Sequence, residues 1–220
     1  AYGMLLFGRS FNEQDISIMT DNAEVAEKYT ELSFSVTGVE AQKSVSEAGK
    51  TTVSFEKFDE MLERAGDLAV DRDTYARLCR DMEAGKSLLY LTDNAGEIGF
   101  DRILGEVIHQ QYPDLEITFC VRGAPVLNDA SRADAEFMGI PFPVIDNGNN
   151  IAGTQLDLLS EEAKQALETA DVIIAKGQAN AETLLDSPYN IYFAFMVKCP
   201  RFIQRFDKPK LTPMLVKERT

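Results

Sequence analysis

Polar side chains with the chemistry of a metal and phosphate site follow three short apolar runs in the part of the chain after Gly85. Asp93 and Asn94 come after the first run, Asp129 after the second, and Lys176 and Gly177 after a later one. Carboxylate and amide oxygens are the ligands that Mg²⁺ and Mn²⁺ prefer in proteins. A lysine supplies a mobile cation for phosphate oxygens, and a glycine lets the backbone approach a ligand closely. These residue types predict a site for a divalent cation and a phosphate group.

Four further residues near the same runs extend this candidate site. Arg122, Asn128 and Asn180 are expected to bind the phosphate or the rest of a substrate, and Glu97 is expected to take part in catalysis. Each of these polar residues also has an ordinary explanation, because Asp and Asn commonly cap helices and lysines commonly lie on surfaces. Their coincidence after several apolar runs favours the functional interpretation.

The histidine and cysteine content excludes other kinds of site. His109 is the only histidine, and the three cysteines are widely spaced, so a structural Cys/His zinc site and most Ser-His-Asp or Cys-His mechanisms are excluded. No GxGxxG or GxxxxGK[ST] motif supports dinucleotide or Walker-type binding. Cys120 and Cys199 lie in or beside apolar runs and are expected to be buried free thiols. This cysteine usage is typical of a reducing compartment and predicts a cytoplasmic protein.

A parallel sheet would bring the candidate residues together. After Gly85, short apolar runs alternate with amphipathic segments, which predicts an α/β fold with a mostly parallel sheet flanked by helices. Ligands bind outside the carboxyl ends of the strands in such sheets. Strands are expected at 87–92, 115–121, 143–145, 171–175, 191–197 and 214–216, and helices at 98–111, 129–138, 161–169, 180–185 and 201–206.

The first part of the chain has a different pattern. Apolar residues recur at helical steps over 55–82, with a break near Asp71, and residues 1–54 show mixed periodicity punctuated by glycines. We therefore expect an α-rich N-terminal cap region over 1–85 and the metal- and phosphate-binding domain over 86–220. The tetrapeptide at 20–23 repeats that at 92–95, but it lacks the following glycine and is expected to cap a helix over 23–29.

Composition limits the partners. The 220 residues include 22 Lys and Arg against 36 Asp and Glu, a net charge of −14, which argues against a nucleic-acid partner. The basic stretch at 198–220 is expected to be a solvated surface. The longest apolar run, 191–197, is far shorter than the about 20 residues of a membrane helix, so no membrane partner is expected. The sequence leaves the oligomeric state open.

Four motifs in order resemble the damage-control phosphatase family, in its shorter prokaryotic branch. They are DNAGEIGFDRIL at 93–104, VRGAPVLNDA at 121–130, KGQANAETL at 176–184 and the pair at 198–199. The resemblance implies a Rossmann-like domain that hydrolyses phosphate from sugar phosphates, phosphopantetheine-type compounds or damaged metabolites with Mg²⁺, Mn²⁺, Co²⁺ or Ni²⁺. It places the metal ligands on Asp93, Asn94 and Asp129 and the phosphate-contacting lysine on Lys176, and it matches Asn180 to the Asn of the KGxxN motif.

The sequence therefore predicts a metal-dependent phosphatase that acts on a small phosphorylated metabolite. Glu97 or Asp129 would orient or deprotonate the attacking water, and a covalent route through Asp93 is the mechanistic alternative. Two other classes of function are alternatives, and one of them would use the same residues. One is a metabolite sensor that binds metal and anion without turnover. The other alternative, a nucleotide-sugar-binding α/β domain of a transferase, instead predicts a nucleotide fingerprint that the sequence lacks.

Overall fold

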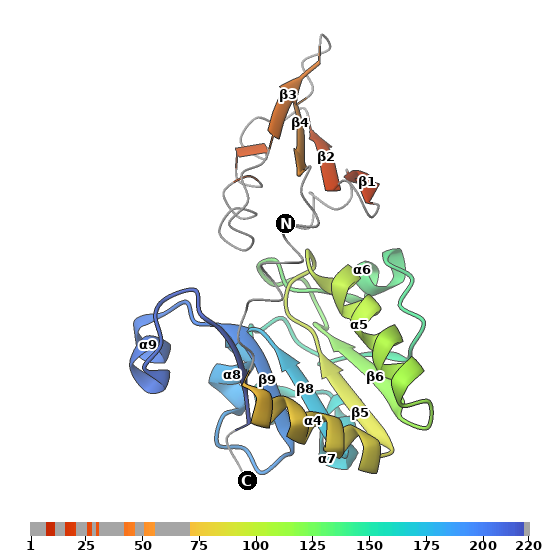
Figure 1. Cartoon of the computed structure of the whole chain (residues 1–220). Helices are drawn as coiled ribbons and strands as arrows, with labels where there is room; N and C mark the ends of the chain where they lie inside the picture. The colour runs from red at the N-terminus through yellow and green to blue at the C-terminus, as the bar shows by residue number, and fades with distance from the viewer. Residues whose placement is uncertain are drawn as a thin grey trace. The chain divides into compact units, whose positions relative to one another are not determined.

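The computed structural model describes residues 8–11, 16–20, 26–27, 30, 42–46, 51–55 and 71–217 of the chain (Figure 1). The chain divides into two compact units, Ala1–Ala69 and Val70–Thr220. The second unit carries all the candidate site residues.

Most of the described residues of the first unit form a four-stranded antiparallel sheet, with the strands in the order β1-β2-β4-β3. The strands are β1 Gly8–Phe11, β2 Ile16–Thr20, β3 Gln42–Val45 and β4 Thr51–Phe55. The expectation of an α-rich region over 1–54 is wrong for these residues, because β-branched residues in β2 and β4 favour pairing as strands. Of the helix expected over 23–29, residues 26 and 27 are helical, as is residue 30. The expected helical stretch over 56–70 lies outside the described residues.

The second unit is built on a six-stranded sheet in the order β10-β9-β8-β5-β6-β7. Neighbouring strands are parallel except for β10, which pairs with β9 in antiparallel fashion. Read from β7 to β10, this is the 3-2-1-4-5-6 order of a doubly wound Rossmann-like sheet, which confirms the expected fold. The strands are β5 Ser87–Leu91, β6 Glu116–Val121, β7 Val144–Asp146, β8 Val172–Lys176, β9 Ile191–Met196 and β10 Pro213–Val216.

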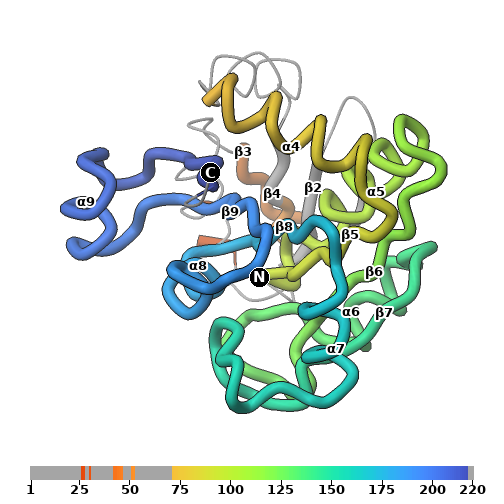
Figure 2. The backbone as a smooth tube through the Cα atoms, turned by 90° about the horizontal axis from the view of Figure 1, so that it is seen from below, coloured from red at the N-terminus to blue at the C-terminus, as the bar shows by residue number. Residues whose placement is uncertain are grey.

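Helices cover both faces of this sheet (Figure 2). On the central strand β5, Leu88 and Tyr90 pack on the side of α4 and α5, whereas Leu89 and Leu91 pack on the side of α7 and α8. This alternation explains why the strand reads as a continuous apolar run. No helix among the described residues is both long and apolar enough to cross a membrane. The helices are α4 Arg72–Ala84, α5 Ile98–Gln111, α6 Arg132–Phe137, the 3₁₀ helix η1 Leu156–Leu158, α7 Glu161–Thr169, α8 Gln178–Leu184 and α9 Pro200–Phe206.

Helix α4 belongs to the second unit and not, as we expected, to the first. We expected the boundary after residue 85, but the chain divides between Ala69 and Val70, so α4 belongs to the second unit. The physical reason is that Leu78 and Met82 of α4 are buried in the same apolar cluster as Leu88 of β5.

The three cysteines are all free. Cys120 is buried, as expected, and burial raises the pKa of its thiol to about 12. Cys199 is only partly buried, which corrects the expectation that it would lie in the core. It precedes α9 at the end of the last parallel strand, where the chain leaves the sheet.

Candidate active site

The candidate residues meet at the point where the strand order reverses. β5 lies between β6 and β8, so the chain leaves these neighbouring strands in diverging directions at their carboxyl ends. Asp93 and Asn94 follow β5, Lys176 ends β8 and Gly177 follows it. This position is the usual ligand site of open α/β sheets.

Asp93 is held directly against the backbone of the next strand end. Its residue is 9% exposed, and a Cβ atom built on Gly177 would overlap the Asp93 carboxyl group. Gly177 also has a positive φ of 83°, so both space and backbone conformation require glycine there. The close approach that the sequence predicted at Gly177 is therefore made to Asp93.

Burial and neighbouring charges shape the titration of Asp93. Burial, and after it the negative charges of Glu97 and Asp129, raise its pKa to about 6, although the positive charges of Lys198 and Lys176 oppose this rise. Asp93 therefore lies within electrostatic reach of all four groups. A carboxylate in this position gains from a nearby cation.

Backbone and side-chain hydrogen bonds join the loop after β6 to the loop after β5. Asn94 and Asp129 form an isolated antiparallel bridge, and the Ala130 amide donates to the Asp93 carbonyl at 2.8 Å. The Asn128 side chain donates to Asn94 Oδ1 at 2.5 Å. This bridge keeps residues 129 and 130 extended, which explains why α6 begins only at Arg132 and not at the expected residue 129. The three expected metal ligands therefore lie together on two linked loops.

Arg122 and Asn180, which we expected to bind substrate, are occupied by protein partners. Arg122 is 5% exposed, and it donates to Asp129 Oδ2 at 2.7 Å, to the Gly153 carbonyl at 2.5 Å and to Asn180 Oδ1 at 3.0 Å. Asn180 is fully buried and donates to the carbonyl oxygens of Thr92 and Lys176 at 3.1 and 2.7 Å. Both side chains thus brace the loops that carry Asp129 and Lys176, and their contact with substrate stays a prediction.

Lys176 is paired with two carboxylates. Its Nζ donates to Glu97 Oε2 and to Asp101 Oδ1, each at 2.8 Å. Burial alone would lower the pKa of Lys176, but the charges of Asp101 and Glu97 raise it well above its usual value. Burial also opposes ionisation of Glu97, yet the charge of Lys176 and hydrogen bonds from Lys176 and Asn94 hold the pKa of Glu97 below its usual value. Lys176 is therefore a fixed ammonium ion.

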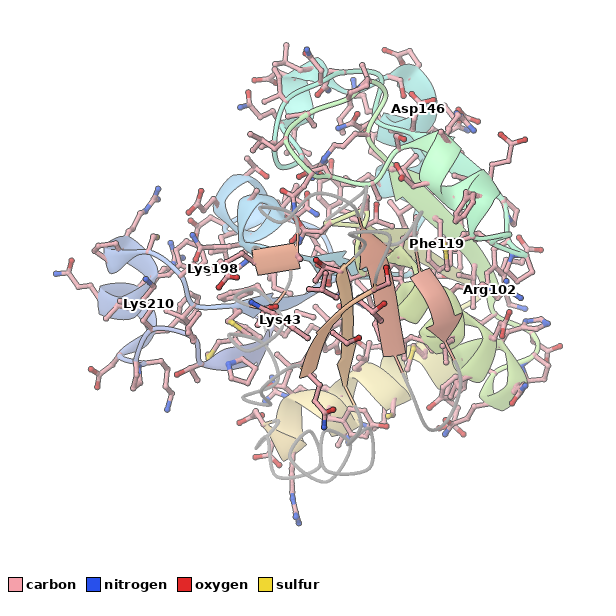
Figure 3. The ribbon with its side chains drawn as sticks, turned by 90° about the horizontal axis from the view of Figure 1, so that it is seen from above. Lys43, Arg102, Phe119, Asp146, Lys198 and Lys210 are labelled. Carbon is pink, nitrogen blue, oxygen red and sulfur yellow. The ribbon has the colours of Figure 1, made fainter. Side chains whose placement is uncertain are left out.

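Asp101 and Lys198 belong to the site, although neither was among the predicted site residues. Asp101 lies one helical turn after Glu97 at the start of α5, and this four-residue spacing was the signal in the sequence. Lys198 is exposed after the carboxyl end of β9, and its amide donates to Gln178 Oε1 at 2.9 Å. In Figure 3, Lys198 lies nearer the sheet than Lys210 does. The site thus includes a second lysine, which is exposed and within electrostatic reach of Asp93.

The charge balance and donor set fit a divalent cation. Four carboxylates, those of Asp93, Glu97, Asp101 and Asp129, lie with two mostly buried cations, Lys176 and Arg122, and the exposed Lys198. The carboxylates therefore outnumber all three cations by one and the two buried cations by two. In the described part of the chain, no group of three or more His, Cys, Asp or Glu side chains is arranged to hold a metal ion. The fitting set is instead two carboxylates and one amide, from Asp93, Asp129 and Asn94, and such oxygen donors suit a hard cation.

Comparisons with known proteins show what this chain is similar to. The sequence model of the damage-control phosphatase ARMT1-like domain matches residues 14–211. The chain is 37% identical over 141 residues to a damage-control phosphatase of Pyrococcus horikoshii, covering 63% of this chain and 49% of that protein. It is 40% identical over 124 residues to a damage-control phosphatase of Archaeoglobus fulgidus, covering 54% of this chain and 42% of that protein.

A solved structure shows the same fold. The crystal structure of a DUF89 family protein from Pyrococcus horikoshii matches with a TM-score of 0.66 and 33% sequence identity, covering 74% of this chain and 57% of that one. The chain spans about half the length of the curated relatives that it matches.

Proposed function

Because the chain belongs to the family of the damage-control phosphatase ARMT1-like domain, we propose that it is a metal-dependent phosphatase acting on a small, damaged phosphometabolite. The observation that carries this proposal is the cluster at the switch point of the sheet. There, two carboxylates and an amide lie beside a fixed lysine, within reach of a second lysine.

Asp93, Asn94 and Asp129 would hold the cation. When bound, a divalent ion supplies positive charge that neutralises the phosphoryl oxygens and activates the hydrolytic water. Arg122 fixes one oxygen of Asp129, and the Asn94 amide nitrogen donates to Asp93 Oδ2 at 2.8 Å. Two of the three ligand side chains are thus oriented before any ligand arrives, which favours binding.

Lys176 and Lys198 would bind the phosphoryl group. An ammonium has three N–H donors, and Lys176 uses two of them on Glu97 and Asp101. The third remains for a phosphoryl oxygen. Because the ammonium is already fixed, it stabilises negative charge that develops in the transition state without reorganising.

We assign the orientation of the attacking water to Asp129 and not to Glu97. Both Glu97 oxygens already accept hydrogen bonds, from Asn94 at 2.7 Å and from Lys176 at 2.8 Å. Arg122 occupies only Oδ2 of Asp129. Glu97 then serves to hold Asn94 and Lys176 in place.

The substrate class follows from the same groups. One cation and two lysines suit the phosphate of a monoester, such as a sugar phosphate or a phosphopantetheine-type compound.

The three free cysteines support a reducing compartment such as the cytoplasm for this reaction.

Phosphate release from a panel of phosphomonoesters tests the proposal. Metal-stripped protein should be inactive, and Mn²⁺, Mg²⁺, Co²⁺ or Ni²⁺ should restore turnover of at least one compound. Asp93→Asn should abolish this turnover, whereas Asp114→Asn should keep it, because Asp114 is exposed in the turn before β6. Metal and phosphate binding without release of phosphate from any ester would instead indicate a sensor.

A further inference from the structure

The second carboxylate on Lys176 has an unusual environment. Asp101 is 2% exposed, and its Oδ1 accepts both from Lys176 Nζ at 2.8 Å and from the Tyr90 hydroxyl at 2.7 Å. Its Oδ2 is buried and has no hydrogen-bond partner among the described residues. A buried carboxylate oxygen without a partner is costly, so this arrangement calls for a reason other than stability.

Tyr90 is placed to orient Asp101. The tyrosine lies on the central strand β5, is fully buried, and stacks on Phe119 with ring centroids 4.7 Å apart. Its ring is therefore fixed by packing. The hydroxyl then selects which Asp101 oxygen faces Lys176, since both groups bind to Oδ1.

We propose that Asp101, oriented by the Tyr90 hydroxyl, is a positioning residue that fixes the Lys176 ammonium for the phosphoryl group. This inference rests on the proposed phosphatase function. Lys176 has a flexible four-carbon side chain and also lies within electrostatic reach of Asp93. Asp101 and Glu97 together keep the ammonium on their side, so Lys176 does not pair with Asp93 and Asp93 stays available for a cation.

A second cluster elsewhere in the fold provides a matched control. The Tyr192 hydroxyl and Lys217 Nζ both donate to Asp81 Oδ2, each at 2.7 Å. Asp81 lies on α4, and Tyr192 lies near the amino end of β9, at the edge of the sheet opposite the site. A Tyr, an Asp and a Lys therefore make the same contacts away from the candidate site, where their substitution should affect stability and not catalysis.

Asp101→Asn isolates the charge of Asp101. The amide would keep the acceptor at Oδ1 and place its nitrogen where Oδ2 makes no hydrogen bond, so no bond is lost with the charge. We expect kcat to fall by about 10- to 100-fold, the usual effect of removing a group that orients an active-site side chain. KM should change by less than about 3-fold, because Lys176 still carries its charge. Tyr90→Phe should give a smaller fall in kcat.

Nuclear magnetic resonance of the lysine ammonium groups gives a readout that does not need turnover. In the wild type, Lys176 should show a ¹H–¹⁵N cross-peak protected from solvent exchange, assigned by its absence in Lys176→Arg. The peak should be broadened in Asp101→Asn, because a neutral amide oxygen holds the ammonium more weakly than the carboxylate does, and it should be kept in Asp81→Asn. Asp81→Asn and Tyr192→Phe should lower stability and leave kcat within about 2-fold of the wild type.

The results separate the two proposals. An active wild type whose Asp101→Asn variant keeps both kcat and the Lys176 peak would overturn the positioning role, as would an equal loss of kcat in Asp81→Asn. A wild type that is inactive on every ester with every metal would contradict the phosphatase function. The Lys176 peak would still decide whether Asp101 fixes the ammonium.

Discussion

Substitution of Gly177 by alanine should displace the Asp93 carboxyl group and thereby lower the activity of the site. The glycine has φ 83° and ψ 155°, a conformation that costs a non-glycine residue about 1–3 kcal/mol. The added methyl group would also overlap the Asp93 carboxyl group, and such overpacking costs about 1–3 kcal/mol. We therefore expect the free energy of unfolding to fall by about 2–6 kcal/mol. Displacement of the Asp93 carboxyl group should lower kcat/KM by at least about 100-fold.

Gly139→Ala provides the matched control. Gly139 also has a positive φ, of 61°, but the nearest atom to an added Cβ is the end of the flexible Arg102 side chain at 3.5 Å, an ordinary contact. The control should lose about 1 kcal/mol from backbone strain alone and keep kcat/KM within about 2-fold. Urea unfolding and phosphate release would be measured on both variants. If Gly177→Ala loses stability but keeps wild-type kcat/KM, the contact between Gly177 and Asp93 has no catalytic importance and the reasoning fails.

Three further predictions concern other parts of the second unit. Lys176→Ala should lower kcat and kcat/KM by about 10²- to 10³-fold, with only partial rescue in Lys176→Arg; near-wild-type kcat/KM would remove Lys176 from the phosphate site. Burial raises the pKa of Asp81, but three hydrogen bonds outweigh burial and hold this pKa below its usual value. The Asp81 carboxylate therefore stabilises the fold above pH about 4, and this stabilisation is lost as the pH falls further. Asp81→Asn should thus lower the free energy of unfolding by about 1–2 kcal/mol at pH 7 and by less at pH 3; a difference that grows in acid would contradict this. A thiol reagent should label Cys199 faster than Cys120 in the native protein, because Cys120 is buried with a raised pKa; equal rates would count against the structure.

The sequence predicts the sheet of the second unit well because the pattern is local. The run Leu88–Leu91 is apolar on both faces, and it forms the central strand with clusters on either side. Parallel strands end at the same edge, so Asp93, Asn94 and Asp129 could be placed together without knowledge of any contact.

The roles of single polar residues depend on contacts that the pattern does not contain. Arg122 is occupied partly by the carbonyl of Gly153, which lies in an irregular loop. Asp101 meets Lys176 across 75 positions of the chain. A strand-end position predicts that a side chain is near the ligand, but only the hydrogen bonds show whether it faces the ligand or braces a neighbour.

In the first unit, the sequence pattern did not predict the secondary structure. Mixed periodicity and frequent glycines led us to expect an α-rich region over residues 1–54, whereas most of the described residues there form an antiparallel sheet. In such a sheet, each strand is stabilised by its cross-strand partners, and pairs such as Ile18 with Val53 are distant in the sequence.

The most direct test of the metal site is a titration of metal-stripped protein with Mn²⁺, followed by electron paramagnetic resonance. The wild type should bind Mn²⁺ at one site per chain, and inorganic phosphate should alter the spectrum of the bound ion. Asp129→Asn should weaken this binding by about 10-fold or more while the protein stays folded. Equal Mn²⁺ affinity in the variant and the wild type, with no response to phosphate, would contradict a metal and phosphate site at the ends of β5 and β6.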